Sequence, residues 1–117
     1  MERPDDYEAI TTLDISDKKL KELPSWVSEC KNLEILDCSR NNITHLDNLP
    51  PNLKKLYCHD NKITHLDNLP QRLKELECSN NPLKYTFKTI LFFGRLFPVT
   101  FYFTYSRKWK DHMIMNQ

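Results

Sequence analysis

Residues 33–52 read LEILDCSRNNITHLDNLPPN and residues 53–72 read LKKLYCHDNKITHLDNLPQR, so the chain contains the same unit twice. The two copies agree at 12 of 20 positions, including the whole phrase ITHLDNLP at 43–50 and 63–70. A fixed period in this range is typical of a repeat protein, in which each unit buries its apolar side against its neighbours. The spacing of 20 recurs in four sets of residues: Leu33, Leu53 and Leu73; Leu36, Leu56 and Leu76; Cys38, Cys58 and Cys78; Asn41, Asn61 and Asn81.

An earlier and longer unit fits the same frame. Its slots are occupied by Ile10, Leu13, Ile15 and Lys18. This unit is longer because Ile10 precedes Leu33 by 23 residues. The extra length falls at PSWVSECKN (24–32), for which we expect one short helical turn. The boundaries predicted in this way are a lead-in at 1–9, repeats at 10–32, 33–52, 53–72 and 73–83 (partial), and a C-terminal segment at 84–117.

The pattern L-x-x-L-x-C-x-x-N resembles the leucine-rich repeat over residues 10–83. The period is like that of the short bacterial effector type, although Asp47 and Asp67 stand where that type usually has proline. The phrases LYCHDNKITHLDNLP and LECSNNPL are similar in style to leucine-rich-repeat proteins of giant DNA viruses and their protist hosts. The resemblance implies an α/β-type repeat solenoid, a short arc with a parallel strand sheet on its concave face and an extended, turn-rich convex side. It also implies stacked asparagines at the strand ends.

Each slot of the unit has a physical reason. Side chains alternate along a strand, so we expect Leu36 and Cys38 to face the core while Ile35, Asp37 and Ser39 face outward. Free cysteine is a compact hydrophobic residue, and the asparagine amide can satisfy the backbone where the chain turns away. The residues predicted to be structural are therefore Cys38, Cys58, Cys78, Asn41, Asn61 and Asn81.

Five of the eight differences between the two copies fall in the variable slots of the strand pattern. A fixed scaffold with variable strand-face residues indicates a binding surface. The columns are Thr12, Ile35, Lys55 and Glu75; Asp14, Asp37, Tyr57 and Glu77; and Ser16, Ser39, His59 and Ser79. The second column would suit a basic peptide or surface, with Tyr57 as a rigid anchor. The residues predicted to bind a partner protein are Asp14, Ile35, Asp37, Lys55, Tyr57, His59, Glu75 and Glu77.

The composition favours one intracellular domain. The acidic start MERPDDYEA has no hydrophobic signal region, and three of the four cysteines occupy core slots, so we expect reduced thiols in the cytoplasm and a monomer. Residues 1–83 contain 11 Lys+Arg and 15 Asp+Glu, a net charge of −4. Residues 84–117 contain 6 Lys+Arg and 1 Asp+Glu, a net charge of +5. The strand face is not basic, which argues against nucleic acid as a partner.

All six phenylalanines lie between Phe87 and Phe103. A short repeat array needs its open end covered, so we expect an aromatic, basic C-terminal cap at 84–117. Residues 84–97 suit a helix ending before Pro98, and 99–105 suit a strand or a second helix. Two alternatives remain open at this point: a membrane-associated protein with an interfacial anchor at 85–110, and a truncated array without independent function.

No motif of catalysis is present: the chain lacks a phosphate-binding glycine loop, a nucleophile elbow and zinc-finger spacing. His45 and His65 occupy matching slots, where aligned imidazoles could bind a metal or respond to pH, but duplication alone also explains them. Cys58 and His59 are adjacent and face opposite ways, which makes a shared ion difficult. The sequence therefore predicts a non-catalytic protein-binding module without a cofactor or metal and, by resemblance alone, a virus- or pathogen-derived adaptor acting on a host component.

Overall fold

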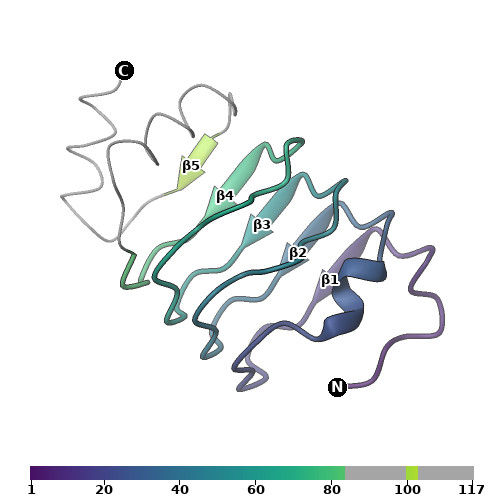
Figure 1. The fold of residues 1–117 in the computed structure, drawn as a ribbon, viewed down its shortest axis with the longest axis horizontal. Helices are drawn as coiled ribbons and strands as arrows, with labels where there is room; N and C mark the ends of the chain where they lie inside the picture. The colour runs from purple at the N-terminus through teal and green to yellow at the C-terminus, as the bar shows by residue number, and fades with distance from the viewer. Residues whose placement is uncertain (84–99, 103–117) are drawn as a thin grey trace.

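The computed structural model describes residues 1–83 and 100–102. Its strands form one parallel sheet in chain order, β1-β2-β3-β4-β5 (Figure 1). From β1 to β4, each connection runs from the end of one strand around to the start of the next, so successive units lie side by side along the longest axis (Figure 1). The strands are β1 (Thr12–Asp14), β2 (Ile35–Asp37), β3 (Lys55–Tyr57), β4 (Glu75–Glu77) and β5 (Thr100–Tyr102).

The register of the sheet reproduces the repeat frame of the sequence. Leu13 pairs with Leu36, Leu36 with Leu56, and Leu56 with Leu76. The pairing of Leu13 with Leu36 agrees with the frame predicted for the unit at 10–32, and the predicted parallel sheet is confirmed. Because each leucine is paired with its own counterpart, side chains of one kind stack in rows along the whole array.

In each unit the chain runs back from the end of one strand to the start of the next, and we call this part of the unit the return segment. The core lies between the strands and the return segments. Leu36 and Cys38 are fully buried, as expected, and Ile43 and Leu46 continue the apolar side along the return segment. Equivalent residues of the other units join one cluster, with Tyr7, Ile10 and Leu83 packed against it. Burial of this continuous row of leucine, isoleucine and cysteine is the main favourable contribution to folding, since each buried aliphatic side chain contributes about 1.5–3 kcal/mol.

The longer first unit contains a single short helix. This 3₁₀ helix, η1 (Ser25–Glu29), lies where one helical turn was predicted, and it buries Trp26 and Val27. The lead-in is tied to it: the Trp26 indole N–H donates to the Met1 carbonyl at 3.2 Å, and Arg3 pairs with Glu29 at 3.1 Å. The longer first unit thus adds Trp26 and Val27 to the core.

The prediction for the C-terminal segment falls largely on residues that the structure does not describe. The expected helix at 84–97 and the anchor considered at 85–110 lie outside the described residues. Within 99–105, residues 100–102 form a strand rather than a helix, and Thr100 pairs with Glu75 of β4 in parallel. Within the described part of the chain, no helix is long and apolar enough to cross a membrane.

Candidate functional site

The strand face presents its variable residues in two complete rows. The pairing register aligns the first row, Thr12, Ile35, Lys55 and Glu75, and the second row, Asp14, Asp37, Tyr57 and Glu77. Ile35, Asp37, Lys55, Tyr57, Glu75 and Glu77 are half-buried, and Thr12 and Asp14 are exposed. Seven of the eight residues predicted to bind a partner are therefore brought together in these rows, and we call the eight residues of the two rows the strand face.

The second row carries fixed negative charge. Asp14 Oδ1 accepts hydrogen bonds from the Ser16 hydroxyl at 2.6 Å and from the Ser16 backbone N–H at 2.9 Å. These two bonds lower the pKa of the Asp14 carboxyl, the hydroxyl bond having the larger effect. In the next unit Asp37 Oδ1 accepts from the Ser39 backbone N–H at 3.0 Å. Both carboxylates are held in place by their own strand-end turns, so the row is ordered before any partner arrives.

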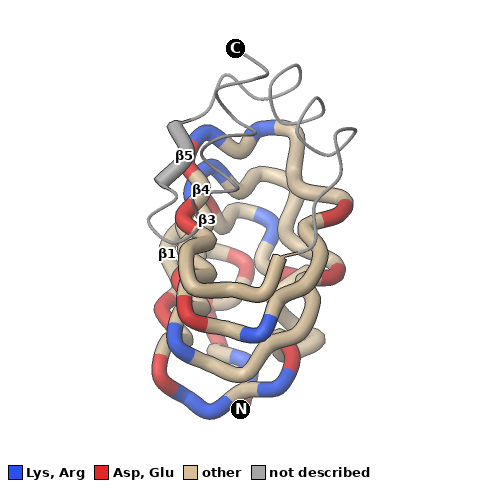
Figure 2. The backbone as a smooth tube through the Cα atoms, turned by 90° about the vertical axis from the view of Figure 1, so that its left-hand side faces the viewer, with Lys and Arg blue, Asp and Glu red and all other residues tan. Residues whose placement is uncertain are grey.

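The two rows are linked through Glu75. Its Oε2 accepts a hydrogen bond from the Tyr57 hydroxyl at 3.3 Å and lies 3.8 Å from Lys55 Nζ. The hydrogen bond positions the Tyr57 ring, and the ion pair partly neutralises the charges of Glu75 and Lys55 on the strand face. The other carboxylates of the second row are those of Asp14 and Asp37 toward one end and that of Glu77 at the other. Along the units as a whole, acidic and basic residues are interspersed (Figure 2).

The third column does not face outward as predicted. Ser39 is fully buried, and Ser79 is 4% exposed. His59 stands between them in the repeat order, and its side chain is only 18% exposed. Its Nδ1 lies 2.6 Å from Asp60 Oδ2, an interaction that lowers the pKa of Asp60. The strand has ended at this position, so the alternation of a regular strand no longer applies. His59 therefore lies at the margin of the strand face rather than within it.

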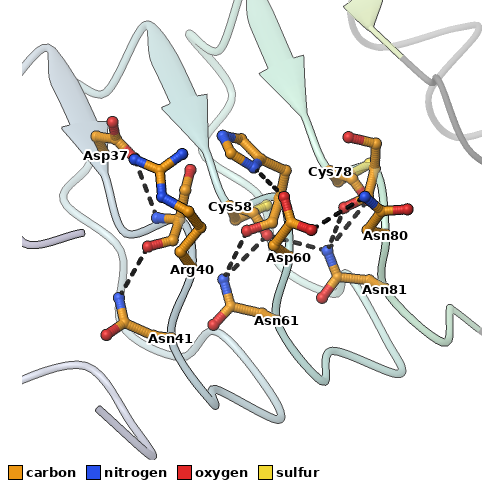
Figure 3. Close-up of polar contacts among 12 residues, drawn as sticks. Asp37, Arg40, Asn41, Cys58, Asp60, Asn61, Cys78, Asn80 and Asn81 are labelled. Carbon is orange, nitrogen blue, oxygen red and sulfur yellow. Dashed lines mark hydrogen bonds and ion pairs between the residues drawn. The ribbon is translucent and has the colours of Figure 1, made fainter. Parts of the chain in front are cut away.

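An asparagine ladder fixes the ends of the strands, as predicted (Figure 3). The Asn61 amide donates to the carbonyls of Cys38, Cys58 and His59 at 3.0–3.2 Å, and its Oδ1 accepts from the Ile43 N–H at 3.0 Å. Asn41 and Asn81 make the same pattern of contacts in their own units. One side chain thus satisfies backbone groups of two units, which holds neighbouring strands in register.

A second polar row was not anticipated from the sequence. The residue before each ladder asparagine has a positive φ, and these residues are Arg40, Asp60 and Asn80. Asp17, which precedes Lys18 in the same slot of the first unit, shares this conformation, and the four φ values are 53–56°. Two pairs of neighbours in this row contact each other. Arg40 Nε lies 2.8 Å from Asp17 Oδ2. Figure 3 shows the second pair, in which the Asn80 amide donates to Asp60 Oδ1 at 3.0 Å. The signal was the prevalence of Asp and Asn in this slot, residues that tolerate the left-handed region.

The cysteines lie in the core as free thiols. Burial raises the pKa of the Cys38 thiol to about 12 and also raises the pKa values of Cys58 and Cys78 well above their usual range. The prediction that these three cysteines are structural agrees with this burial. A neutral, inaccessible thiol is a poor nucleophile and a poor metal ligand, so these side chains act as small apolar residues.

Comparison with known proteins bears on the repeat unit. A family model described as Leucine Rich repeats (2 copies) matches residues 8–50, which include β1, η1 and β2. No curated protein and no solved structure matches the chain. The matched segment contains the first asparagine of the ladder and the paired leucines of β1 and β2, of which Leu36 is buried and Leu13 is half-buried. Residues 8–50 are therefore similar to the leucine-rich repeat family, and β3 and β4 continue the same register.

Proposed function

We propose that this chain is a non-catalytic module that binds a partner protein through the strand face. Leucine-rich-repeat domains generally mediate protein–protein interaction. The observation that carries the proposal is the contrast between the two sides of each strand: Leu36 and Leu56 are identical and fully buried, whereas Asp37 and Tyr57 differ and stand in one outward row. Sequence variation is thus concentrated where the scaffold presents side chains rather than where it packs them.

The chemistry of the second row favours a basic peptide or a Lys/Arg-rich surface as the partner. Asp14 and Asp37 present carboxylates at one end of the row, and Glu77 adds a third at the other. Tyr57 lies between them and is oriented by Glu75, which suits an aromatic anchor with little conformational entropy to lose. A partner with spaced positive side chains would therefore find complementary charge on either side of an aromatic contact.

The experiment compares two charge reversals on the full chain. Asp37→Lys changes the strand face, and Asp67→Lys makes the same change on an exposed residue of a return segment. Binding of a library of displayed Lys/Arg-rich peptides would be selected on the unmodified protein, and the selected peptide would be titrated by fluorescence polarisation. Asp37→Lys should abolish binding and Asp67→Lys should not. Equal loss in both variants, or selection of no peptide, would contradict the proposal.

We also propose that the C-terminal segment 84–117 is an aromatic cap that completes a short solenoid. β5 supports this proposal, because it pairs with β4 in the register of the other strands and so gives the last repeat strand a neighbour. An uncovered β4 would leave an open sheet edge and the end of the apolar core in contact with water. The free, buried thiols support a reducing intracellular location, which we propose together with a monomeric state.

A further inference from the structure

The charge carried by the repeat strands changes sign along the strand direction. The pairing register places the start of each repeat strand at one edge of the sheet and its end at the opposite edge. We call residues 9–12, 32–35, 52–55 and 72–75 the start edge, and residues 14–18, 37–41, 57–61 and 77–81 the end edge. With His59 neutral, the start edge has a net charge of +2 and the end edge a net charge of −3.

The end edge keeps its carboxylates in fixed positions. Asp14 and Asp37 each accept a hydrogen bond from the backbone of their own strand-end turn. Asp60 accepts from the Asn80 amide, and Asp17 is paired with Arg40 at 2.8 Å. The negative charge of this edge is therefore ordered, and it includes the part of the strand face to which basic groups of a partner were assigned above.

Contacts within the start edge leave two of its cations uncompensated. Lys54 Nζ lies 3.1 Å from Glu34 Oε2, and Lys55 Nζ lies 3.8 Å from Glu75 Oε2. Within the described part of the chain, Arg72 and Lys74 have no carboxylate at ion-pair distance, and both residues are exposed. The net charge of +2 at this edge is thus presented to solvent by Arg72 and Lys74.

The uncompensated cations lie together beside a hollow in the surface. Glu34, Lys54 and Arg72 line this hollow, which has a volume of about 380 Å³. Lys74 lies next to Lys54, because its backbone N–H donates to the Lys54 carbonyl at 2.7 Å. Arg72 Nη1 donates to Asn52 Oδ1 at 3.1 Å, which positions the guanidinium while using a single one of its N–H donors. An ordered guanidinium beside an ammonium group suits a carboxylate ligand.

The positive charge of the start edge coincides with differences between the two copies of the repeat. Three of the eight differences put a cation at this edge of the later unit, at Lys54, Lys55 and Arg72. The earlier unit has Glu34, Ile35 and Asn52 in these slots. The phrase at 43–50 and 63–70 is identical in both copies, so the change in charge is confined to the strand side and its margins.

We propose that the partner segment carries charges of both signs, with basic side chains over the end edge and acidic side chains over Arg72 and Lys74 at the start edge. This proposal rests on the function proposed above and adds a second element to the partner's chemistry. Lys74 precedes Glu77 by three residues, and a strand rises about 3.3 Å per residue, so the two groups of charges lie about 10 Å apart. The same cations repel a uniformly basic segment, which gives the surface selectivity among basic partners.

The test compares three synthetic peptides of equal length, titrated against the full chain by fluorescence polarisation at low salt. The first has a lysine half and a glutamate half, and the second has glutamine in place of every glutamate. The third has the composition of the first, with lysine and glutamate alternating. The first peptide should bind about fivefold more tightly than either of the others. Residues 1–83 have a net charge of −4, so attraction to net charge alone would favour the second peptide instead.

Charge reversals assign each half of the peptide to its edge. The double variant Arg72→Glu, Lys74→Glu should abolish the advantage of the first peptide over the second. Asp37→Lys should weaken both of these peptides alike, because both present the lysine half to the end edge. The matched control is Lys21→Glu, Lys62→Glu, which makes the same change in net charge at exposed residues outside both edges and should keep the advantage. Circular dichroism would verify that each variant folds.

The outcomes separate this proposal from the function on which it rests. Equal affinity for the first and second peptides would overturn the proposal while leaving protein binding through the strand face intact. Loss of the advantage in the control variant would also overturn it, because net charge would then account for the preference. If none of the peptides binds, both the function proposed above and this proposal fail.

Discussion

The side chain of Asn61 reaches back into the preceding unit, where its Oδ1 accepts a 3.0 Å hydrogen bond from the buried backbone N–H of Ile43. The same amide donates to carbonyls on both strands, those of Cys38 and Cys58. Asn61, which the 20-residue spacing marks in the sequence, thus bridges two neighbouring units. The stability of the array depends on these bridges as well as on its apolar core, because the strands themselves are only three residues long.

Replacing Asn61 should be strongly destabilising. In Asn61→Ala the Ile43 N–H and the Cys38 and Cys58 carbonyls lose a partner, and each unsatisfied buried group costs about 1–3 kcal/mol. We expect a loss of roughly 3 kcal/mol or more in the free energy of unfolding, measured by urea titration followed by circular dichroism. The matched control is Asn42→Ala, an exposed neighbour, which should change stability by less than about 0.5 kcal/mol. Equal losses in the two variants would contradict the ladder's role.

Relieving backbone strain should stabilise the first unit. Lys19 has a φ of 57°, a conformation that disfavours a residue with a β-carbon and that glycine adopts freely. Lys19→Gly should raise the free energy of unfolding by about 0.5–1 kcal/mol, the strain relief exceeding the extra entropy of the unfolded chain. Lys21→Gly, made where φ is not positive, should lower stability instead. Urea midpoints that move in the same direction for both variants would exclude strain at Lys19.

Alkaline pH should unfold the protein through its buried thiols. Burial raises the pKa of Cys38 to about 12, whereas a thiol in the unfolded chain titrates near 8.5. The folded state therefore holds a proton that the unfolded state releases, so stability is full below about pH 8.5 and falls as pH rises toward 12. The slope is about 1.4 kcal/mol per pH unit for each such thiol. Urea titrations at a series of pH values should show that the free energy of unfolding falls less steeply with pH in Cys38→Ala than in the unmodified protein. An unchanged slope would refute the role of the Cys38 thiol.

Removal of the C-terminal segment should abolish cooperative folding. A chain ending at Leu83 lacks β5, so β4 becomes an uncovered edge and the core beneath Leu76 and Cys78 ends in water. The full chain should unfold in one cooperative thermal transition in reducing buffer without detergent, and residues 1–83 should not. If the shorter chain folds and the full chain requires detergent, the segment is instead an anchor for a membrane or a partner.

Most of the repeat architecture could be predicted because its cause is local and periodic. The spacing of Leu36, Leu56 and Leu76 specifies strands in register, and the recurrence of asparagine specifies the ladder, since each unit can bury its apolar side only against a copy of itself. The three additional residues before Leu33 likewise indicated the helical turn that became η1. The rows of the strand face followed from alternation along the strand, as far as the strand extends.

The predictions went wrong or stayed open where the chain leaves the regular strand. Ser39 was expected to face outward by alternation, but the backbone turns into a left-handed conformation at Arg40 and the serine is buried. The same turn brings His59 onto Asp60 and creates the polar row that links Asp17 to Arg40. These contacts depend on φ angles that no residue type in those slots dictates uniquely.

By itself the sequence determined the period and most of the inward residues of this protein, because hydrophobic burial in a repeated unit leaves few other arrangements. The tertiary structure decided which residues of neighbouring units meet: the Tyr57 side chain with that of Glu75, and the His45 backbone with that of His65. Residues twenty positions apart become neighbours only once the strands and return segments are paired. The physical reason is that the ladder and the stacked core fix register between units, and register cannot be read from any one unit alone.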